Sequence, residues 1–413
     1  MNPPRVIVVG AGPAGMMAAI RAAQCQAEVT IFEKNPRLGV KLFLTGKGRC
    51  NLTNAASLEE FLTRFGRNGQ FLRDAFRVFF NKELMDFFES RKVTLKVERQ
   101  LRVFPESDKA ETIVSVLKGE LAKLKIRQEF LQPVDEIIIS EEKKVQGVKV
   151  RGVFLPAEKV IIATGGASYP STGSDGTGLK MAKSVGHNLT PLSPGLVPLV
   201  IEEIFIKRLE GLSLKNIRLI FNDGKKNLAT EIGELLFTSF GVSGPLVLSH
   251  SADISQWCMD KKVRLKIDLK PALSIEQLKN RLDREIADSP NRSVKIFLKS
   301  FLPIRMIEVF LECLKIDGQK KVNQLMRQER LDIVAFLKNF TLTVKGPLSI
   351  REAMVTRGGV SLKEVNPRTM ESRLVGGLYF AGEILDLDAD TGGFNLQAAF
   401  STGYLAGESA STA

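Results

Sequence analysis

Cysteine and histidine are scarce in this 413-residue chain. It contains four cysteines, Cys25, Cys50, Cys258 and Cys313, without C-x-x-C spacing, and only two histidines. This set offers little for a structural zinc site or a redox dithiol. We therefore predict no bound metal, and we expect the cysteines to be reduced, as in a cytoplasmic protein.

Long hydrophobic runs are also missing. No stretch of 18 or more apolar residues occurs, and the apolar segment over residues 6–20 is interrupted by glycine and proline. The sequence therefore predicts neither a membrane-spanning helix nor a signal peptide. With 44% hydrophobic and 25% charged residues, the chain has the composition of a soluble enzyme with two or three domains.

Aromatic residues are few, at 7%, whereas positive charge is in excess, with a formal net charge of +13 at pH 7. The densest basic patch, residues 261–266, alternates basic and apolar positions and has no interleaved aromatic rings. This alternation is typical of a strand with a solvated basic face. We therefore do not expect nucleic acid as a partner, although the charge leaves RNA and anionic substrates as alternatives.

The N-terminal segment contains a complete dinucleotide-binding pattern. An apolar strand over residues 6–9 leads into a G-x-G-x-x-G turn over residues 10–15, and a helix follows. Gly10 permits the tight turn, Gly12 lets the backbone approach a pyrophosphate, and Gly15 lets the helix pack on the strand. The helix N-terminus offers N–H groups to the phosphates. Candidate contacts to the cofactor in this turn are Gly10, Gly12, Pro13, Ala14 and Gly15.

The second strand of this unit, residues 27–32, ends at Glu33, 18 residues beyond Gly15 (33 minus 15). This spacing suits a carboxylate that accepts hydrogen bonds from a ribose 2′-OH, and it would repel a 2′-phosphate. The site therefore fits the adenosine half of FAD or NAD, and not NADP.

The segment after Glu33 favours flavin. Glycines alternate with basic and amide side chains over residues 39–54, as expected of a loop around a partly anionic ligand. Lys41 and Arg49 can offer charge to phosphate or to a reduced flavin, and Asn51 can read an amide edge; a solvated basic loop is the alternative. We interpret Cys50 as a small buried residue packed on the cofactor. The candidate contacts here are Lys34, Lys41, Gly46, Arg49, Cys50 and Asn51.

The C-terminal segment carries another strand–turn–helix unit. An apolar strand over residues 377–381 ends at a Gly-Glu pair, and a helix of small residues opens near Asn395 and runs to about Gly407. In two-motif flavoproteins such a strand end meets the ribityl chain, and the helix N-terminus stabilises the negative charge of reduced flavin. We therefore expect FAD, held tightly and non-covalently between the two ends of the chain. The candidate contacts are Gly382, Glu383, Gly393, Asn395 and Leu396.

Between these ends the pattern predicts an insertion. A β-rich region leads to a buried parallel strand over residues 159–164, and a proline-rich joint follows at residues 191–198. Helical periodicity marks residues 57–65, 68–91 and 110–123, and Ser274 is typical of a helix N-cap. Val134, Thr164 and Gly165 complete the candidate cofactor contacts. We predict an α/β fold: a discontinuous Rossmann-like FAD-binding domain (residues 1–190 and 346–413) with an inserted β-barrel-like domain (191–345), β-rich over 191–272 and helical over about 273–340.

The sequence identifies no catalytic acid or base. His187 follows a predicted helix end and His250 lies in an apolar stretch; either is a candidate base, but lone histidines are more often structural. Tyr169, just after the glycine turn at residues 165–166, is the best candidate for an acid that faces the substrate.

Taken together, these motifs resemble the YhiN-like (BaiN-like) flavoproteins, which are aminoacetone-oxidase-like FAD-dependent oxidoreductases. Two positions depart from that family: Ser239 stands where histidine is usual, and Phe394 stands where tyrosine is usual. Any role of those two side chains in proton transfer or substrate contact is therefore in doubt. The resemblance rests on motifs at residues 10–15, 46–54, 163–166, 233–238, 243–245, 358–362 and 381–397.

The resemblance implies an FAD-dependent oxidoreductase that transfers hydride between flavin N5 and a small organic substrate. One branch reduces a C=C bond conjugated to a ketone, and another oxidises a small amine with O₂; the low aromatic content slightly weakens the amine alternative. Residues 169–178 also look like fumarate-reductase and ketosteroid-dehydrogenase flavoproteins. Because no second G-x-G-x-x-G occurs, NAD(P)H, if used, must dock transiently. A flavoprotein that binds or modifies RNA is the alternative of another class.

Overall fold

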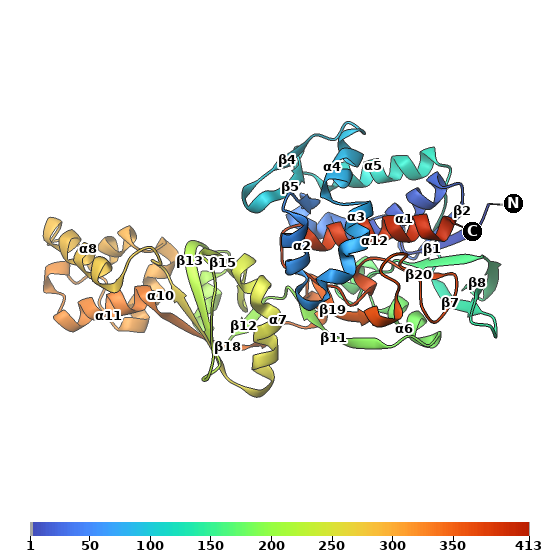
Figure 1. Ribbon diagram of the computed structural model, residues 1–413. Helices are drawn as coiled ribbons and strands as arrows, with labels where there is room; N and C mark the ends of the chain where they lie inside the picture. The colour runs from blue at the N-terminus through green and yellow to red at the C-terminus, as the bar shows by residue number, and fades with distance from the viewer. Residues whose placement is uncertain (1–2, 413) are drawn as a thin grey trace. The chain divides into compact units, whose positions relative to one another are not determined.

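The computed structural model describes residues 3–412, which divide into two compact units (Figure 1). The first unit comprises the described residues up to Gly195 and from Ile350 onward, and the second is Leu196–Ser349. The expected insertion began earlier, at residue 191. The proline-rich joint instead forms most of strand β11 (Leu189–Gly195), which pairs antiparallel with β19 (Val355–Val360) inside the first unit.

A five-stranded parallel sheet forms the centre of the first unit, in the order β20-β10-β1-β2-β6. Its three neighbouring strands β20, β10 and β1 are almost wholly buried, which accounts for the runs of valine and isoleucine in β1 and β10 and for the apolar and aromatic residues of β20. The predicted α/β Rossmann-like fold is confirmed. The strands are β1 (Arg5–Val9), β2 (Glu28–Glu33), β6 (Arg127–Phe130), β10 (Lys159–Ile162) and β20 (Leu378–Phe380).

Smaller elements surround this sheet. The strands form a sheet of β3 (Thr53–Asn54), β4 (Leu95–Val97) and β5 (Arg102–Pro105), and another of β7 (Val134–Ile139), β8 (Val145–Val150) and β9 (Val153–Pro156). The α-helices are α1 (Pro13–Gln24), α2 (Leu58–Arg64), α3 (Arg73–Val78), α4 (Asn81–Glu89), α5 (Ala110–Lys123), α6 (Thr177–Ser184) and α12 (Phe394–Ser411). The 3₁₀ segments are η1 (Val40–Gly48), η2 (Gly66–Leu72), η3 (Arg99–Leu101), η4 (Pro170–Thr172), η8 (Ile350–Glu352), η9 (Leu362–Glu364) and η10 (Gly382–Ile384).

The helical pattern predicted over residues 68–91 is broken into η2, α3 and α4. Phe79 is extended, with φ −148°, and α4 starts afresh because the Glu83 carboxylate accepts the backbone N–H of Phe80. The side chain of Asn81 also donates to the carbonyls of Asn54 and Ala56, which fixes the start of α4 from outside the helix. Tertiary contacts therefore override the continuous helical period at this point.

Helices α1 and α12 lie side by side in the first unit (Figure 1). Glycines on α12 permit this approach. A Cβ atom on Gly403 would stand 2.3 Å from the carbonyl oxygen of Ala14, and one on Gly407 would stand 2.2 Å from that of Ala18. The two chain ends are thus joined by backbone-to-backbone packing.

Replacing Gly407 by alanine should destabilise the protein by about 1–3 kcal/mol through overpacking, although alanine favours helices by up to about 1 kcal/mol. The matched control is Gly119→Ala in α5, where a Cβ meets nothing within 4 Å and the same substitution should stabilise by roughly 0.5–1 kcal/mol. Urea unfolding measures both changes. Equal effects at the two glycines would contradict the close helix packing.

The second unit is built on an antiparallel sheet in the order β14-β13-β15-β16-β12-β18-β17, and β13 also pairs with β17. This last pairing closes six strands into a barrel, so the antiparallel inserted sheet is confirmed. Ser274 does cap a helix: its Oγ accepts the Gln277 N–H at 3.1 Å. The strands are β12 (Leu199–Ile201), β13 (Ser213–Asn222), β14 (Asn227–Ala229), β15 (Gly233–Phe237), β16 (Gly241–Ser243), β17 (Val263–Asp268) and β18 (Phe340–Pro347).

Five α-helices and three 3₁₀ segments complete the described part of the second unit. Helices α8, α10 and α11 lie together at one end of the barrel (Figure 1). No helix within residues 3–412 is long and apolar enough to cross a membrane. These elements are α7 (Pro245–Asp260), α8 (Ile275–Asp288), α9 (Val294–Phe297), α10 (Ile304–Leu314), α11 (Arg327–Lys338), η5 (Ile204–Leu209), η6 (Leu298–Ser300) and η7 (Val322–Gln324).

Candidate functional site

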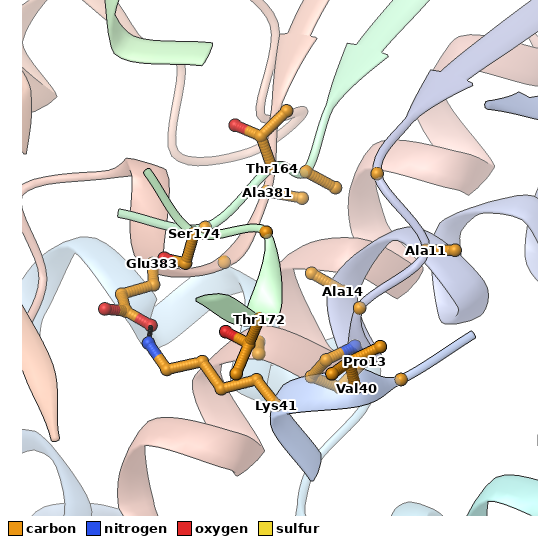
Figure 2. Close-up of a pocket in the computed structure, with 18 of the residues that line it drawn as sticks. Ala11, Pro13, Ala14, Val40, Lys41, Thr164, Thr172, Ser174, Ala381 and Glu383 are labelled. Carbon is orange, nitrogen blue, oxygen red and sulfur yellow. Dashed lines mark hydrogen bonds and ion pairs between the residues drawn. The ribbon is translucent and has the colours of Figure 1, made fainter. Parts of the chain in front are cut away.

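A cavity of about 370 Å³ lies in the first unit at the carboxyl ends of its parallel strands (Figure 2). Val9 of β1, Phe32 of β2, Ala163 after β10 and Ala381 after β20 all line it. Ligands of open α/β sheets bind at this edge. The cavity is therefore the candidate cofactor site.

The glycine turn forms one wall of the cavity. Gly10 has φ +99°, and a Cβ there would stand 2.7 Å from the carbonyl oxygen of Ala163, while a Cβ on Gly15 would stand 1.9 Å from the carbonyl oxygen of Gly10. A Cβ on Gly12 would meet nothing within 4 Å. The tight-turn and close-packing roles predicted for Gly10 and Gly15 are confirmed, and the space above Gly12 is open to a ligand. No side chain caps the N-terminus of α1, so its first N–H groups are free to bind an anion.

Glu33 ties the glycine turn to the end of β2. Its Oε2 accepts the Ala11 N–H at 2.8 Å, and its Oε1 accepts both the backbone N–H and the side-chain N–H of Asn35, each at 2.8 Å. The same amide of Asn35 donates to the carbonyl of Thr172 at 2.9 Å. Glu33 therefore has a structural role that the sequence did not predict, besides the proposed one toward a ribose.

A partly buried ion pair lies in the cavity wall (Figure 2). Lys41 Nζ lies 2.6 Å from Glu383 Oε2 and donates to Ser168 Oγ at 2.8 Å. Glu383 Oε1 accepts the Ser168 hydroxyl at 2.9 Å and the Thr356 N–H at 2.8 Å. Burial acts to raise the pKa of Glu383, but the charge and hydrogen bond of Lys41, with the donors of Thr356 and Ser168, lower it overall. Glu383 therefore lies beside Lys41 as a carboxylate.

Two buried hydroxyl oxygens in the cavity, Thr164 Oγ1 and Ser174 Oγ, have no hydrogen-bond partner among the described residues. Buried polar groups normally have partners, so these two call for a ligand. A ligand with phosphate oxygens, hydroxyls and an apolar ring system would satisfy the free N–H groups, the hydroxyls and the apolar walls together. The chemistry of the cavity therefore fits FAD.

Most of the cofactor contacts predicted from sequence line this one cavity. Asn395 does so while its side chain is occupied: its amide exchanges hydrogen bonds with the backbone of Ala389, at 2.9 Å and 2.8 Å, and so shapes the loop before α12. Glu33, Lys41 and Glu383 were predicted as separate contacts and prove to be joined into networks. The lining residues among the predicted set are Gly10, Gly12, Pro13, Ala14, Glu33, Lys34, Lys41, Val134, Thr164, Gly165, Gly382, Glu383, Asn395 and Leu396.

Six predicted contacts are not among the residues that line this cavity, and Arg49 is the clearest case. Its guanidinium pairs with Glu98 and Asp108 and lies over the ring of Phe104, 4.1 Å from the centroid, so its charge is already used. Cys50 is fully buried, and burial raises the pKa of its thiol to about 12, which makes it unreactive. The other non-lining residues are Gly15, Gly46, Asn51 and Gly393.

Among the polar residues that the sequence missed are Asn35, Ser168 and Thr356. Thr356 Oγ1 accepts the N–H groups of Ala167 and Ser168 at 2.7 Å and 3.1 Å, which fixes the turn that carries Ser168. No motif marked these residues. Asn35 alone had a usable signal, since it follows Glu33 directly at the end of a predicted strand.

The candidate acids and bases do not line the cavity. Tyr169 has φ +52°, and burial raises the pKa of its phenol. His187 is buried between Glu364, 3.0 Å from Nδ1, and Ser372, 2.8 Å from Nε2. Ser372 Oγ accepts two backbone N–H groups, so the Ser372 hydroxyl donates its proton to Nε2 of His187. Both ring nitrogens of His187 thus have protein partners, and neither is left for a substrate. The geometry supports a structural role for His187.

Acid should weaken the fold through this histidine. Burial lowers the pKa of His187 below its ordinary value of about 6.5, although Glu364 opposes the shift. The stabilising contribution of neutral His187 is therefore complete above about pH 6.5 and is lost as the pH falls toward the folded-state pKa, because the unfolded chain binds the proton first. Urea unfolding from about pH 8 to about pH 5 measures this loss, and H187Q should lose stability at pH 8 yet show a flatter pH dependence. An unchanged pH dependence in H187Q would contradict the assignment.

A family model described as the HI0933-like protein Rossmann domain matches residues 4–409. The chain is 32% identical over 409 residues to the 3-dehydro-bile acid delta(4,6)-reductase of Clostridium scindens, covering 98% of both proteins. It is also 32% identical over 405 residues to the ribosomal RNA dihydrouridine synthase of Haemophilus influenzae, covering 96% of both.

Among solved structures, a 3-ketosteroid-Δ4-(5α)-dehydrogenase from Rhodococcus jostii RHA1 matches with a TM-score of 0.53 at 15% identity, covering 99% of this chain and 96% of that one. A flavocytochrome c3 fumarate reductase matches with a TM-score of 0.50 at 16% identity, covering 99% and 78%. At these identities the likeness shows the fold alone. The full-length family match and the cavity agree with the family resemblance of the sequence motifs. The chain belongs to the HI0933-like (YhiN/BaiN-like) family of FAD-dependent Rossmann-fold oxidoreductases.

Proposed function

We propose that this protein reduces a C=C bond conjugated to a carbonyl group. The observation that carries the proposal is that two full-length relatives, equally similar to this chain, are named for reductions of this one kind. A 3-dehydro-Δ4,6 bile acid has its double bonds conjugated to a 3-ketone. Uridine, from which dihydrouridine is made, has a C5=C6 bond conjugated to its C4 carbonyl. The two substrates differ greatly in size but share the group that is reduced.

The chain's own residues bind and orient FAD in this proposal. The free N–H groups at the start of α1 receive the pyrophosphate above Gly12, and Thr164 and Ser174 supply hydroxyls to the ligand. Bound flavin supplies the hydride-transfer chemistry. Lys41, held in its ion pair with Glu383, and the uncapped N-terminus of α12 would provide positive potential for the charge that reduction creates.

A reductant must deliver electrons to the flavin, and we propose that NAD(P)H does so as a visitor. The chain has one G-x-G-x-x-G turn, which the FAD site uses. The amine-oxidase alternative has less support, since both full-length relatives are named for reductive chemistry.

Anaerobic stopped-flow spectroscopy tests the proposal. The holoenzyme, reduced by NADH or NADPH, is mixed with a 4-ene-3-ketosteroid, with a uridine oligonucleotide, or with an unconjugated alkene of similar size. We expect rapid flavin reoxidation by at least one conjugated substrate, a product heavier by two hydrogen atoms, and no reaction with the unconjugated alkene. Reoxidation by neither conjugated substrate, or reduction of the oxidised enzyme by small amines, would overturn the proposal.

A further inference from the structure

Six basic side chains gather on the outside of the barrel in the second unit. We call them the barrel cation face; they come from β13, β17, the β13–β14 turn and the end of β18. Five are exposed, and Lys266 is half-buried. The barrel cation face consists of Arg218, Lys225, Lys226, Arg264, Lys266 and Lys345.

Strand register places these residues together. In β17, Leu265 and Ile267 are fully buried in the barrel core, so the alternate positions Arg264 and Lys266 point outward. Arg264 lies opposite Asn222 of β13, directly before the turn that carries Lys225 and Lys226. Val263 lies opposite Val344, so the next residue of β18, Lys345, belongs to the same end of the barrel.

None of these six side chains forms an ion pair with a carboxylate of the described residues. The nearby acids have other partners: Asp223 pairs with Lys261 at 2.5 Å and Glu202 pairs with Lys262 at 3.2 Å. Asp268, which lies opposite Arg218, pairs with Lys338 at 2.7 Å, and Glu203 accepts the backbone N–H of Thr343. Asp223 also accepts the backbone N–H groups of Lys225 and Lys226. Like charges on adjacent strands repel each other in the free protein. An anionic partner would remove that repulsion.

The remaining outward positions select the kind of anion. Thr343 and Asn222 lie opposite Arg264, so hydrogen-bond donors flank that charge on both sides. Thr341 lies opposite Lys266 on one side, and the half-buried Ile220 lies opposite it on the other. A membrane-binding face needs exposed apolar or aromatic side chains beside its cations. Lysine, arginine, threonine and asparagine are the groups that contact nucleic-acid backbones, and without aromatic rings they read phosphate and not base.

We propose that the barrel cation face binds the phosphodiester backbone of an RNA substrate. The inference rests on the proposed function and deepens it, because it selects uridine within RNA over a free small molecule as the substrate class. From the sequence alone we interpret the basic patch at residues 261–266 as a solvated surface without a nucleic-acid partner. The proposal reverses that interpretation. The strand arrangement adds what the sequence did not show: the cations of that patch that lack partners share a face with those of β13 and β18.

A charge-matched pair of variants tests the proposal in the FAD-loaded full chain. The barrel variant carries five glutamines in place of Lys225, Lys226, Arg264, Lys266 and Lys345. The control variant carries five glutamines in place of Lys279, Arg284, Lys299, Lys321 and Arg327, which are also exposed and also lack ion pairs with described residues. Nine of the ten side chains are exposed and Lys266 is half-buried, and thermal unfolding checks that both variants fold.

The probe is a fluorescein-labelled single-stranded oligouridylate, titrated at several salt concentrations. At about 0.7 in the log–log salt slope per phosphate contact, the barrel variant should lose about 2–3.5 from the slope and bind on the order of 100-fold or more weakly in 0.1 M salt. The control variant should bind within about threefold of the wild type, because net charge alone acts weakly at a distance in salt. Equal weakening in both variants, or binding to anionic vesicles but not to RNA, would overturn the inference.

The same variants separate this inference from the proposed function. Reduction of a 4-ene-3-ketosteroid by an enzyme that does not bind RNA through this face would leave the proposed function standing and overturn the inference. RNA binding through the face by a holoenzyme that reduces no conjugated C=C bond would support the inference and overturn the proposed function. If both hold, the barrel variant should have a raised KM for the oligonucleotide and an unchanged rate with a small conjugated substrate.

Discussion

Gly12→Asp should give a folded apoprotein at least as stable as the wild type that no longer binds FAD. Gly12 is the N-cap residue of α1, with φ −76° and ψ −175°, a conformation open to any residue. Aspartate is a preferred N-cap, because its carboxylate accepts the free N–H groups of the first turn. Those are the donors that we assign to the pyrophosphate. The substitution therefore stabilises the helix and occupies the anion site in one step.

The loss of FAD affinity should be large. A carboxylate roughly 4 Å from a phosphate charge adds about 4 kcal/mol of repulsion at an effective dielectric constant near 20, or on the order of a thousandfold in affinity. The flavin absorbance of the purified protein and fluorescence titration of the apoprotein measure it, and urea unfolding measures stability. Gly12→Asn is the control, since it caps the helix without charge and should lose less affinity. A yellow Gly12→Asp protein would contradict the placement of the pyrophosphate.

Much of the fold and of the cavity could be predicted because the signals are local. The tight turn at Gly10, the close helix approach at Gly15 and the strand that ends at Glu33 each lie within one βαβ unit. In each case the residue constrains the backbone of the same βαβ unit, close to it in the sequence. The order of elements then placed the two glycine-rich ends of the chain at one edge of the parallel sheet.

Partners far apart in the sequence could not be predicted. Lys41 and Glu383 are separated by 342 positions, and nothing in either segment names the other. Arg49 looked available for a ligand because its partners, Glu98 and Asp108, reach it only through the folding of the segment around β4 and β5. The barrel cation face was hidden for the same reason, since strand pairing and not sequence spacing collects its members.

Of the two residues in the Lys41–Glu383 pair, Lys41 should be the more harmful one to replace. Lys41→Met leaves the Glu383 carboxylate in the cavity wall without its counter-ion, and loss of one partner of a fully buried pair costs about 3–5 kcal/mol. Here 22% and 20% of the two side chains are exposed, so we expect about 2 kcal/mol in the apoprotein. The double variant Lys41→Met/Glu383→Gln should recover more than half of this loss, because no uncompensated charge remains. Urea unfolding of the wild type, of the two single variants Lys41→Met and Glu383→Gln, and of the double variant completes the double-mutant cycle.

A second readout addresses the flavin directly. Without the Lys41 cation the negative charge of reduced flavin loses support, so the midpoint potential of the bound flavin should fall, by about 30 mV for each tenfold loss in preference for the reduced form. Lys34→Met is the matched control: Lys34 also lines the cavity and pairs with Asp175 at 2.7 Å, but 30% and 41% of those side chains are exposed, so its loss should change stability little.

The free energy of unfolding should also depend on pH through this pair. Lys41 lowers the pKa of Glu383, so the stability supplied by this pair is complete above the ordinary carboxyl pKa and is lost as the pH falls below it. A Lys41→Met protein with wild-type stability, acid sensitivity and flavin potential would show that the pair neither supports the fold nor supplies potential to the cofactor.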